Sequence, residues 1–245
     1  MKITTLIIAG FGILAIASCR KDNSNSNNSS SGQPKVYIEE TRSSPIYGNL
    51  KAVYNLTYDG NGRILSLEST SPSLKFAYQY NSNNTFTMDL YTNNTLDIHE
   101  LLFIGPSSFV DSTFQYNNTN DTSTEKYFYN SAKQIQEKRE YEYSSVYGST
   151  LTNSEFYTYD NNGNAISLTD NNGTTTLTYT NFPNKKTLGS VYFPTSKYLP
   201  DTQTYTSGST TISATHRYSF DNNQRLVADS GFESIGDTVI KSYVY

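Results

Sequence analysis

The sequence predicts an all-β protein, an antiparallel meander of about 12–14 strands that forms a strongly curved sheet or a partly closed barrel. Only 35% of its 245 residues are apolar, yet 14% are aromatic, with 22 Tyr, 12 Phe and no Trp. Ser, Thr and Asn are abundant and good helix formers are scarce, which disfavours helical bundles and doubly wound α/β folds. Tyrosine is therefore expected to be the main core-forming residue.

A tyrosine-rich hairpin unit recurs along the chain. Residues 56–67 align without gaps with residues 157–168, and a third copy covers residues 218–227. Aromatics two positions apart share one face of a strand, and the Asp, Asn and Gly that follow them favour a tight turn. The unit thus predicts hairpins with Tyr, Leu and Ile on one face and Ser and Thr on the other. Looser copies begin at Tyr78, Phe114 and Tyr127.

Two segments have a composition that also fits a helix. Residues 132–142 are rich in Lys, Glu and Gln, but they directly follow one of the looser copies, and Tyr141 and Tyr143 restore the two-residue alternation. Residues 96–104 precede a turn at Gly105-Pro106. We therefore expect both segments to be strands.

The first eighteen residues read as a secretory leader. Lys2 is followed by a mostly apolar run over residues 3–17, which at about fifteen residues is short for a membrane-spanning helix. Residues 16–19, Ile-Ala-Ser-Cys, resemble the bacterial lipobox, and Cys19 is the only cysteine. The resemblance implies cleavage before Cys19 and acylation of its thiol, which would anchor the protein in a membrane; an ordinary signal peptide with an incidental cysteine is the alternative.

This reading divides the chain into a leader (1–18), a lipidated cysteine with a disordered Asn/Ser-rich tether (19–34) and one β domain (35–245). No Asp follows Cys19 directly, so the inner-membrane retention signal of some lipoproteins is missing. We expect an outer-membrane lipoprotein, with the leaflet left open.

Two family resemblances follow from these motifs. Residues 58–64, Tyr-Asp-Gly-Asn-Gly-Arg-Ile, resemble the YD repeat of Rhs-type and teneurin shell proteins, except that Leu56 stands at the first Tyr of the motif. In other copies Asn164 and Gln224 replace its Arg and its Gly. The leader, the tether, the hairpins and the Lys-Tyr-Leu-Pro element at residues 197–200 together resemble Bacteroidetes lipoproteins with a domain of unknown function and a porin-like fold. The second resemblance implies a curved sheet or barrel and no established activity.

Charge and motif content argue against several functions. A net charge of −4 and a pI near 5.2 provide no basic surface for nucleic acid. With His99 and His216 as the only histidines, no metal site is indicated, and no cofactor motif or catalytic nucleophile appears. We therefore expect no enzyme. The alternative is a surface hydrolase such as a glycoside hydrolase, which needs only two carboxylates. Its candidates are Glu100, Glu125, Glu137 and Glu155.

The expected function is a non-catalytic binding or structural module of the envelope, with a glycan or a peptide as ligand. An aromatic ring with a hydroxyl group can stack on a sugar or peptide and also form hydrogen bonds, although the same rings could simply cover the core. Asp111-Ser112-Thr113 and Asp237-Thr238-Val239 resemble a short O-glycosylation sequon, which would place Ser112 and Thr238 on loops. The candidate binding residues are Tyr58, Tyr80, Tyr129, Tyr157, Tyr159 and Tyr218.

Overall fold

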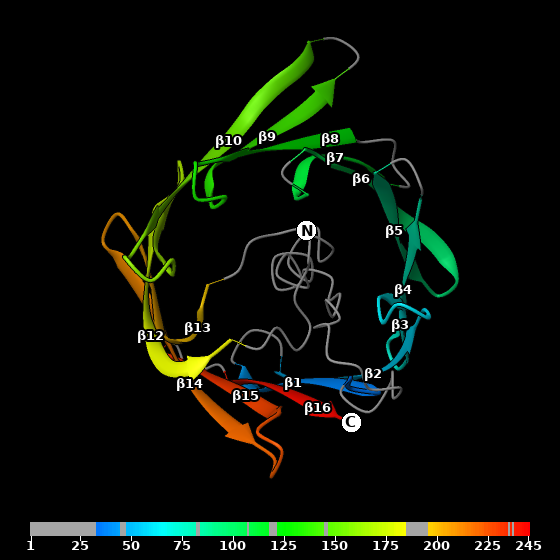
Figure 1. The fold of residues 1–245 in the computed structure, drawn as a ribbon, viewed down its shortest axis with the longest axis vertical. Coiled ribbons are helices and arrows are strands. Elements are labelled where there is room, and N and C mark those ends of the chain that lie inside the picture. The colour runs from blue at the N-terminus through cyan, green and yellow to red at the C-terminus, as the bar shows by residue number, and fades with distance from the viewer. Residues whose placement is uncertain are drawn as a thin grey trace.

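In a computed structural model of the chain, sixteen antiparallel strands close into one barrel (Figure 1). The structure describes residues 33–44, 48–81, 84–106, 108–117, 122–144, 147–184, 196–234, 236 and 238–245. The expected leader, Cys19 and residues 20–32 of the expected tether lie outside the described residues.

The strands range from 5 residues in β11 to 12 residues in β10. They are β1 (Val36–Ser44), β2 (Gly48–Tyr58), β3 (Ile64–Thr70), β4 (Ser73–Tyr80), β5 (Thr85–Thr92), β6 (Thr95–Ile104), β7 (Val110–Asn117), β8 (Thr122–Tyr129), β9 (Ile135–Ser144), β10 (Gly148–Tyr159), β11 (Ala165–Thr169), β12 (Thr174–Pro183), β13 (Tyr198–Ser207), β14 (Thr210–Phe220), β15 (Leu226–Glu233) and β16 (Thr238–Val244).

Each strand pairs with its neighbours in sequence, and β1 pairs with β16 to close the ring. The closing register joins Val36 to Val244 and Tyr37 to Tyr243. The prediction of an all-β antiparallel meander is confirmed. The described residues form sixteen strands, more than expected, and the sheet closes completely into a barrel. The two segments with helical composition are strands as well, since they form most of β6 and β9. Among the described residues there is no helix of the length and apolarity that crossing a membrane by a helix would require.

The repeated Asp turns lie at one end of the barrel, where even-numbered strands pass to odd-numbered ones; we call this end the tyrosine rim. In the turn after β2, Asp59 Oδ1 accepts hydrogen bonds from the backbone nitrogens of Asn61 (2.9 Å) and Arg63 (2.8 Å). Gly62 has a φ of +79°, which a glycine adopts without steric cost. Asp160 and Asp221 make the same backbone contacts in the turns after β10 and β14.

The two faces of the wall differ as the alternation predicts. Side chains directly opposite one another in the register share a face, so Tyr54 and Leu56 line the inside with Leu67 and Phe76. On the outer face, cross-strand hydroxyl pairs recur, and their oxygens lie 2.6–3.4 Å apart. These outer pairs are Thr57–Ser66, Thr158–Ser167, Thr169–Thr174, Thr178–Thr202, Thr204–Ser213 and Thr206–Thr211.

The inner wall itself is divided into two parts. The buried hydrophobic cluster comes from β1 to β7 and their turns, with Phe86 and Val110 fully buried. The inner side of β8 to β16 is more charged, with Glu125, Lys138, Asp229 and Lys241 among its side chains. The cluster consists of Tyr37, Tyr54, Leu56, Ile64, Leu67, Phe76, Tyr78, Phe86, Leu102 and Val110.

One of the looser copies of the hairpin unit departs from the pattern. Phe114 and Tyr116 lie on the outer face of β7. The inward residue Leu102 pairs with Thr113, so the next residue, Phe114, points outward. Both are exposed, and Tyr116 stacks on His99 with ring centres 4.8 Å apart. The spacing of aromatics at this position resembles the unit, but β7 runs toward the opposite end of the barrel.

Candidate functional site

Seven tyrosines near the tyrosine rim donate their hydroxyl groups to backbone carbonyls of earlier parts of the chain; we call them the rim tyrosines. Tyr159, for example, donates to the carbonyl of Ile135 (2.8 Å), and burial raises its pKa to about 12. Each bond joins the rim end of an even-numbered strand to the start of the strand before it, so the same contact recurs around the rim. The rim tyrosines are Tyr58, Tyr80, Tyr129, Tyr159, Tyr179, Tyr218 and Tyr245.

Five of the six tyrosines expected to bind a ligand are rim tyrosines. The sixth, Tyr157, donates its hydroxyl to Glu155 (2.6 Å) on the inner wall. All six hydroxyl groups therefore have a hydrogen-bond partner within the protein, and these bonds explain their positions without a ligand. A binding role for these tyrosines stays a prediction, and it would depend on their rings more than on their hydroxyl groups.

A charged group lies on the inner wall of β6 to β10; we call Glu100, Glu125, Lys138, Glu140 and Glu155 the acid–lysine cluster. The Lys138 ammonium lies 2.6 Å from Glu140, 2.8 Å from Glu155 and 3.5 Å from Glu125. Burial alone would lower the pKa of Lys138, but the neighbouring carboxylates raise it above its usual value. Lys138 is thus the central cation of the cluster.

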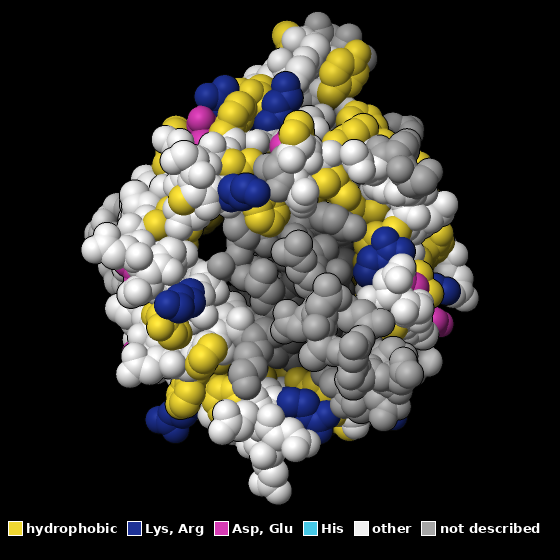
Figure 2. Space-filling view, viewed as in Figure 1, with side chains coloured by type: hydrophobic (Ala, Val, Ile, Leu, Met, Phe, Trp, Pro, Cys, Tyr) yellow, Lys and Arg dark blue, Asp and Glu magenta, His cyan; other side chains and the backbone are white. Residues whose placement is uncertain are grey.

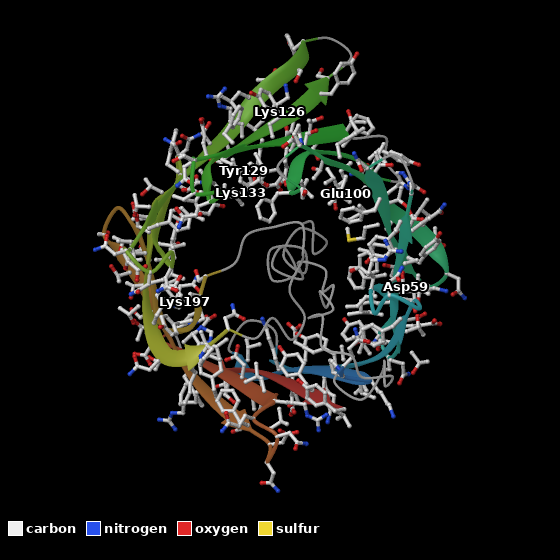
Figure 3. The ribbon with its side chains drawn as sticks, viewed as in Figure 1. Asp59, Glu100, Lys126, Tyr129, Lys133 and Lys197 are labelled. Carbon is white, nitrogen blue, oxygen red and sulfur yellow. The ribbon has the colours of Figure 1, made fainter. Side chains whose placement is uncertain are left out.

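Tyrosines cap two of these carboxylates. Tyr127 donates its hydroxyl to Glu125, as Tyr157 does to Glu155. Glu100 lies on the inner side of the wall, whereas Lys126 points outward (Figure 3). Burial and the charge of Glu125 raise the pKa of Glu100 to about 7, although a hydrogen bond from Thr113 opposes the shift.

The structure thus unites three of the four carboxylates named from the sequence. Glu137 is the exception, because it lies on the outer face and binds Arg139 (Oε1 to Nε, 2.6 Å). Sequence reasoning missed Lys138 and Glu140. The alternation of charged residues in β9 offered a signal, since Lys138 and Glu140 share a face and Glu137 lies on the other.

A second polar group occupies the inner wall of β13 to β16 and β1. There a cavity of about 400 Å³ opens beside His216, whose Nδ1 lies 3.0 Å from Asp229 Oδ1. The His216 ring is nearly parallel to that of Tyr218, with ring centres 6.0 Å apart. We call this cavity the histidine pocket; its lining includes Glu39, Tyr205, His216, Asp229, Gly231, Glu233 and Lys241.

The lining of the histidine pocket includes the small residues Ala214 and Gly231. Gly231 lies on the inner face opposite His216, and a Cβ added there would be 3.7 Å from His216 Cε1, an ordinary contact. Lys241 lies directly across from Asp229 on one side and Glu39 on the other. Hydrogen-bond donors and acceptors of both charges therefore face the same cavity.

His99, the other histidine, belongs to neither inner group. Its Nδ1 lies 2.6 Å from Asp89 on the outer face, where Asp97 shares the strand. No group of three or more His, Cys, Asp or Glu among the described residues could hold a metal ion.

The two proposed glycosylation positions do not lie on loops. Ser112 is within β7, and Thr238 is the first residue of β16. The expectation that the sequon would mark loops is therefore wrong at Ser112, which lies on the outer face of a strand opposite Phe103.

Comparison with solved structures finds a similar fold. The chain resembles a porin-like protein from Bacteroides uniformis ATCC 8492 with a TM-score of 0.58 and 11% identity, over 86% of this chain and 97% of the other. At this identity the likeness shows the fold alone, a closed antiparallel barrel. It agrees with the porin-like fold expected from the family resemblance.

Weaker matches include the Photorhabdus luminescens Tc holotoxin pore, with a TM-score of 0.29 and 13% identity over 78% of this chain and 9% of the other. At that TM-score the match carries no argument. No protein-family model matches the chain, and neither does any curated protein.

Proposed function

We propose that the chain is an outer-membrane lipoprotein whose barrel binds a hydroxyl-rich ligand, a glycan, at the histidine pocket without catalysis. The observation that carries the proposal is the pocket itself. Its volume of about 400 Å³ lies within the ~300–1,000 Å³ of ordinary ligand sites. Because sugar hydroxyls both donate and accept, a lining with His216, Lys241 and Glu39 suits them.

The outward hydroxyl groups of β11 to β14 support a barrel that stands in water. A wall facing lipid needs an apolar band of alternate residues on every strand. Here the outward positions of β11 to β14 carry hydroxyl pairs such as Thr178–Thr202 and Thr204–Ser213. We therefore assign membrane attachment to acylated Cys19.

Binding can be tested with two pocket variants and a matched control. Affinity electrophoresis of the purified protein through gels containing polysaccharides should show retardation by one glycan class. His216→Ala removes a polar group from the pocket, and Gly231→Leu fills it. Each variant should abolish the retardation. Phe232→Ala changes the neighbouring outward side chain and should not. Retardation that survives both pocket variants, or capture of peptides instead of glycans, would refute the glycan site.

The lipid anchor has a separate test. In the native host, Cys19→Ala should abolish palmitate labelling and move the protein from the membrane to the soluble fraction. Retention of the variant in the membrane would show that another part of the chain holds it there.

One observation favours a glycoside hydrolase as the second candidate. Glu100, with its raised pKa, lies close enough to Glu125 for their charges to interact, and a protonated carboxyl beside an ionised one is the pair that glycosidases use. Against it, Lys138 and Tyr127 already engage Glu125. Release of reducing ends that disappears in Glu100→Gln would establish the hydrolase.

A further inference from the structure

Part of β10 has a neighbour on one side only. Residues 148–156 pair with β9, but pairing with β11 begins at Phe156, opposite Thr169. Beyond that point β11 has ended, and the chain turns at Asp170, whose backbone nitrogen bonds to the carbonyl of Gly173. Among the described residues, the stretch 148–155 therefore has no strand on its second edge. Figure 1 shows the β9–β10 hairpin projecting beyond the ring of strands.

An open edge of this length is a template for another strand, and proteins usually blunt such edges with lysine, proline or a bulge. This stretch has a bulge between Leu151 and Asn153 but neither lysine nor proline. Its only ionisable side chain, Glu155, points inward to Lys138. The outer side of the edge is thus uncharged.

Leu151 is the one large apolar side chain of this stretch, and two exposed aromatic rings lie beside it. Leu151 is 51% exposed and Phe156 is 52% exposed on the outer face, and Tyr143 of β9 is 61% exposed. A strand added beside residues 148–155 would place its own outward side chains against Leu151. The hydrophobic side chains at the tip of the hairpin are also visible in Figure 2.

We propose that two copies of the chain pair through this edge, antiparallel and about a two-fold axis, so that one sheet continues from barrel to barrel. A two-fold interface requires a segment that complements itself. Residues 148–155 meet this requirement because no like charges would face each other on the outer side. Leu151 lies at the middle of the stretch, so antiparallel pairing brings it next to its own copy. Since the hairpin projects, the two barrels can approach without colliding.

The proposal is tested by the mass of the purified full chain in light scattering or sedimentation equilibrium. The wild-type protein should have twice the mass of one chain. Leu151→Lys and Leu151→Glu each place like charges at the axis and should yield monomers, whereas their mixture should restore a one-to-one dimer visible in native mass spectrometry. Val53→Lys, an outward residue of β2 with 39% exposure, should remain dimeric.

Folding and pairing are separated by two further measurements. The circular dichroism spectrum of Leu151→Lys should match that of the wild type, because the variant keeps the fold. Hydrogen exchange of residues 149–154 should be slower in the wild type than in the monomeric variant. A monomeric wild type, or a dimer that persists in Leu151→Lys, would overturn the edge pairing.

Discussion

The side-chain oxygen of Asn164 accepts a hydrogen bond from the backbone nitrogen of Tyr198 at 3.0 Å, although 34 residues separate them in sequence. The side-chain nitrogen of the same Asn164 donates to Asp160 Oδ2 at 2.8 Å. In the turns after β2 and β14 the corresponding position is Arg63 or Arg225, whose Nε donates to the Asp of the turn. Asparagine thus replaces arginine where an acceptor is also needed, which explains the departure from the repeat motif.

Replacing Asn164 by arginine should therefore destabilise the barrel. Asn164→Arg keeps a donor for Asp160 but leaves the backbone nitrogen of Tyr198 without its acceptor at a site that is only 1% exposed. We expect the free energy of unfolding to fall by about 2 kcal/mol, measured by urea unfolding. Asn162→Arg, at an exposed position of the same turn, is the control and should change it by less than about 0.5 kcal/mol. Equal stability of the two variants would contradict the role assigned to the Asn164 oxygen.

In the turn after β14, a glycine should stabilise the fold more than the residue present. Gln224 has a φ of +58°, at the place where Gly62 and Gly163 have +79° and +85°. A left-handed backbone costs a non-glycine residue about 1–2 kcal/mol, part of which is offset by the greater freedom of glycine in the unfolded chain. Gln224→Gly should raise the free energy of unfolding by about 0.5–1 kcal/mol, and Gly163→Ala should lower it. A lower denaturation midpoint for Gln224→Gly would show that its side chain contributes more than the backbone strain costs.

The local parts of the fold could be predicted because their physics is local. Asp59 and Gly62 define their turn within five residues, and the alternation that sends Tyr157 and Tyr159 inward is a property of any strand. Closure could not be predicted in this way. It depends on pairing Val36 with Val244 across nearly the whole chain, and no local pattern reveals that register.

The candidate site shows the same division. Glu125 and Glu155 could be named from the sequence, but only the positions of β8 and β10 on either side of β9 bring both to Lys138. Likewise, His216 meets Asp229 through the register of β14 and β15. Residue types were readable from the sequence, whereas their partners depend on strand register.

Lys138 is expected to be essential to the inner wall. Lys138→Met leaves Glu125, Glu140 and Glu155 without their shared cation, and removal of one partner from a buried ion pair costs about 3–5 kcal/mol. The free energy of unfolding at neutral pH should fall by about that amount, and it should recover in part when Glu155→Gln is added. Lys126→Met removes an outward lysine that lies over Tyr141 (5.4 Å) and should cost less than about 1 kcal/mol. Equal losses for the two lysines would contradict a central role for Lys138.

Glu100 should give the barrel a distinctive pH dependence. Burial and the charge of Glu125 raise its pKa to about 7, whereas an unfolded chain releases this proton near pH ~4.3. Between these values the unfolded state loses the proton and the folded state keeps it. The contribution of Glu100 to the free energy of unfolding therefore declines as pH rises and levels off above about pH 7, a total loss of about 4 kcal/mol. Glu100→Gln removes the titration. Urea unfolding from pH 4 to pH 8 should therefore show the variant gaining stability relative to the wild type across that window, while Glu137→Gln on the outer face should show no such gain. A difference between Glu100→Gln and the wild type that stays constant from pH 5 to pH 8 would mean that Glu100 ionises at its ordinary pH.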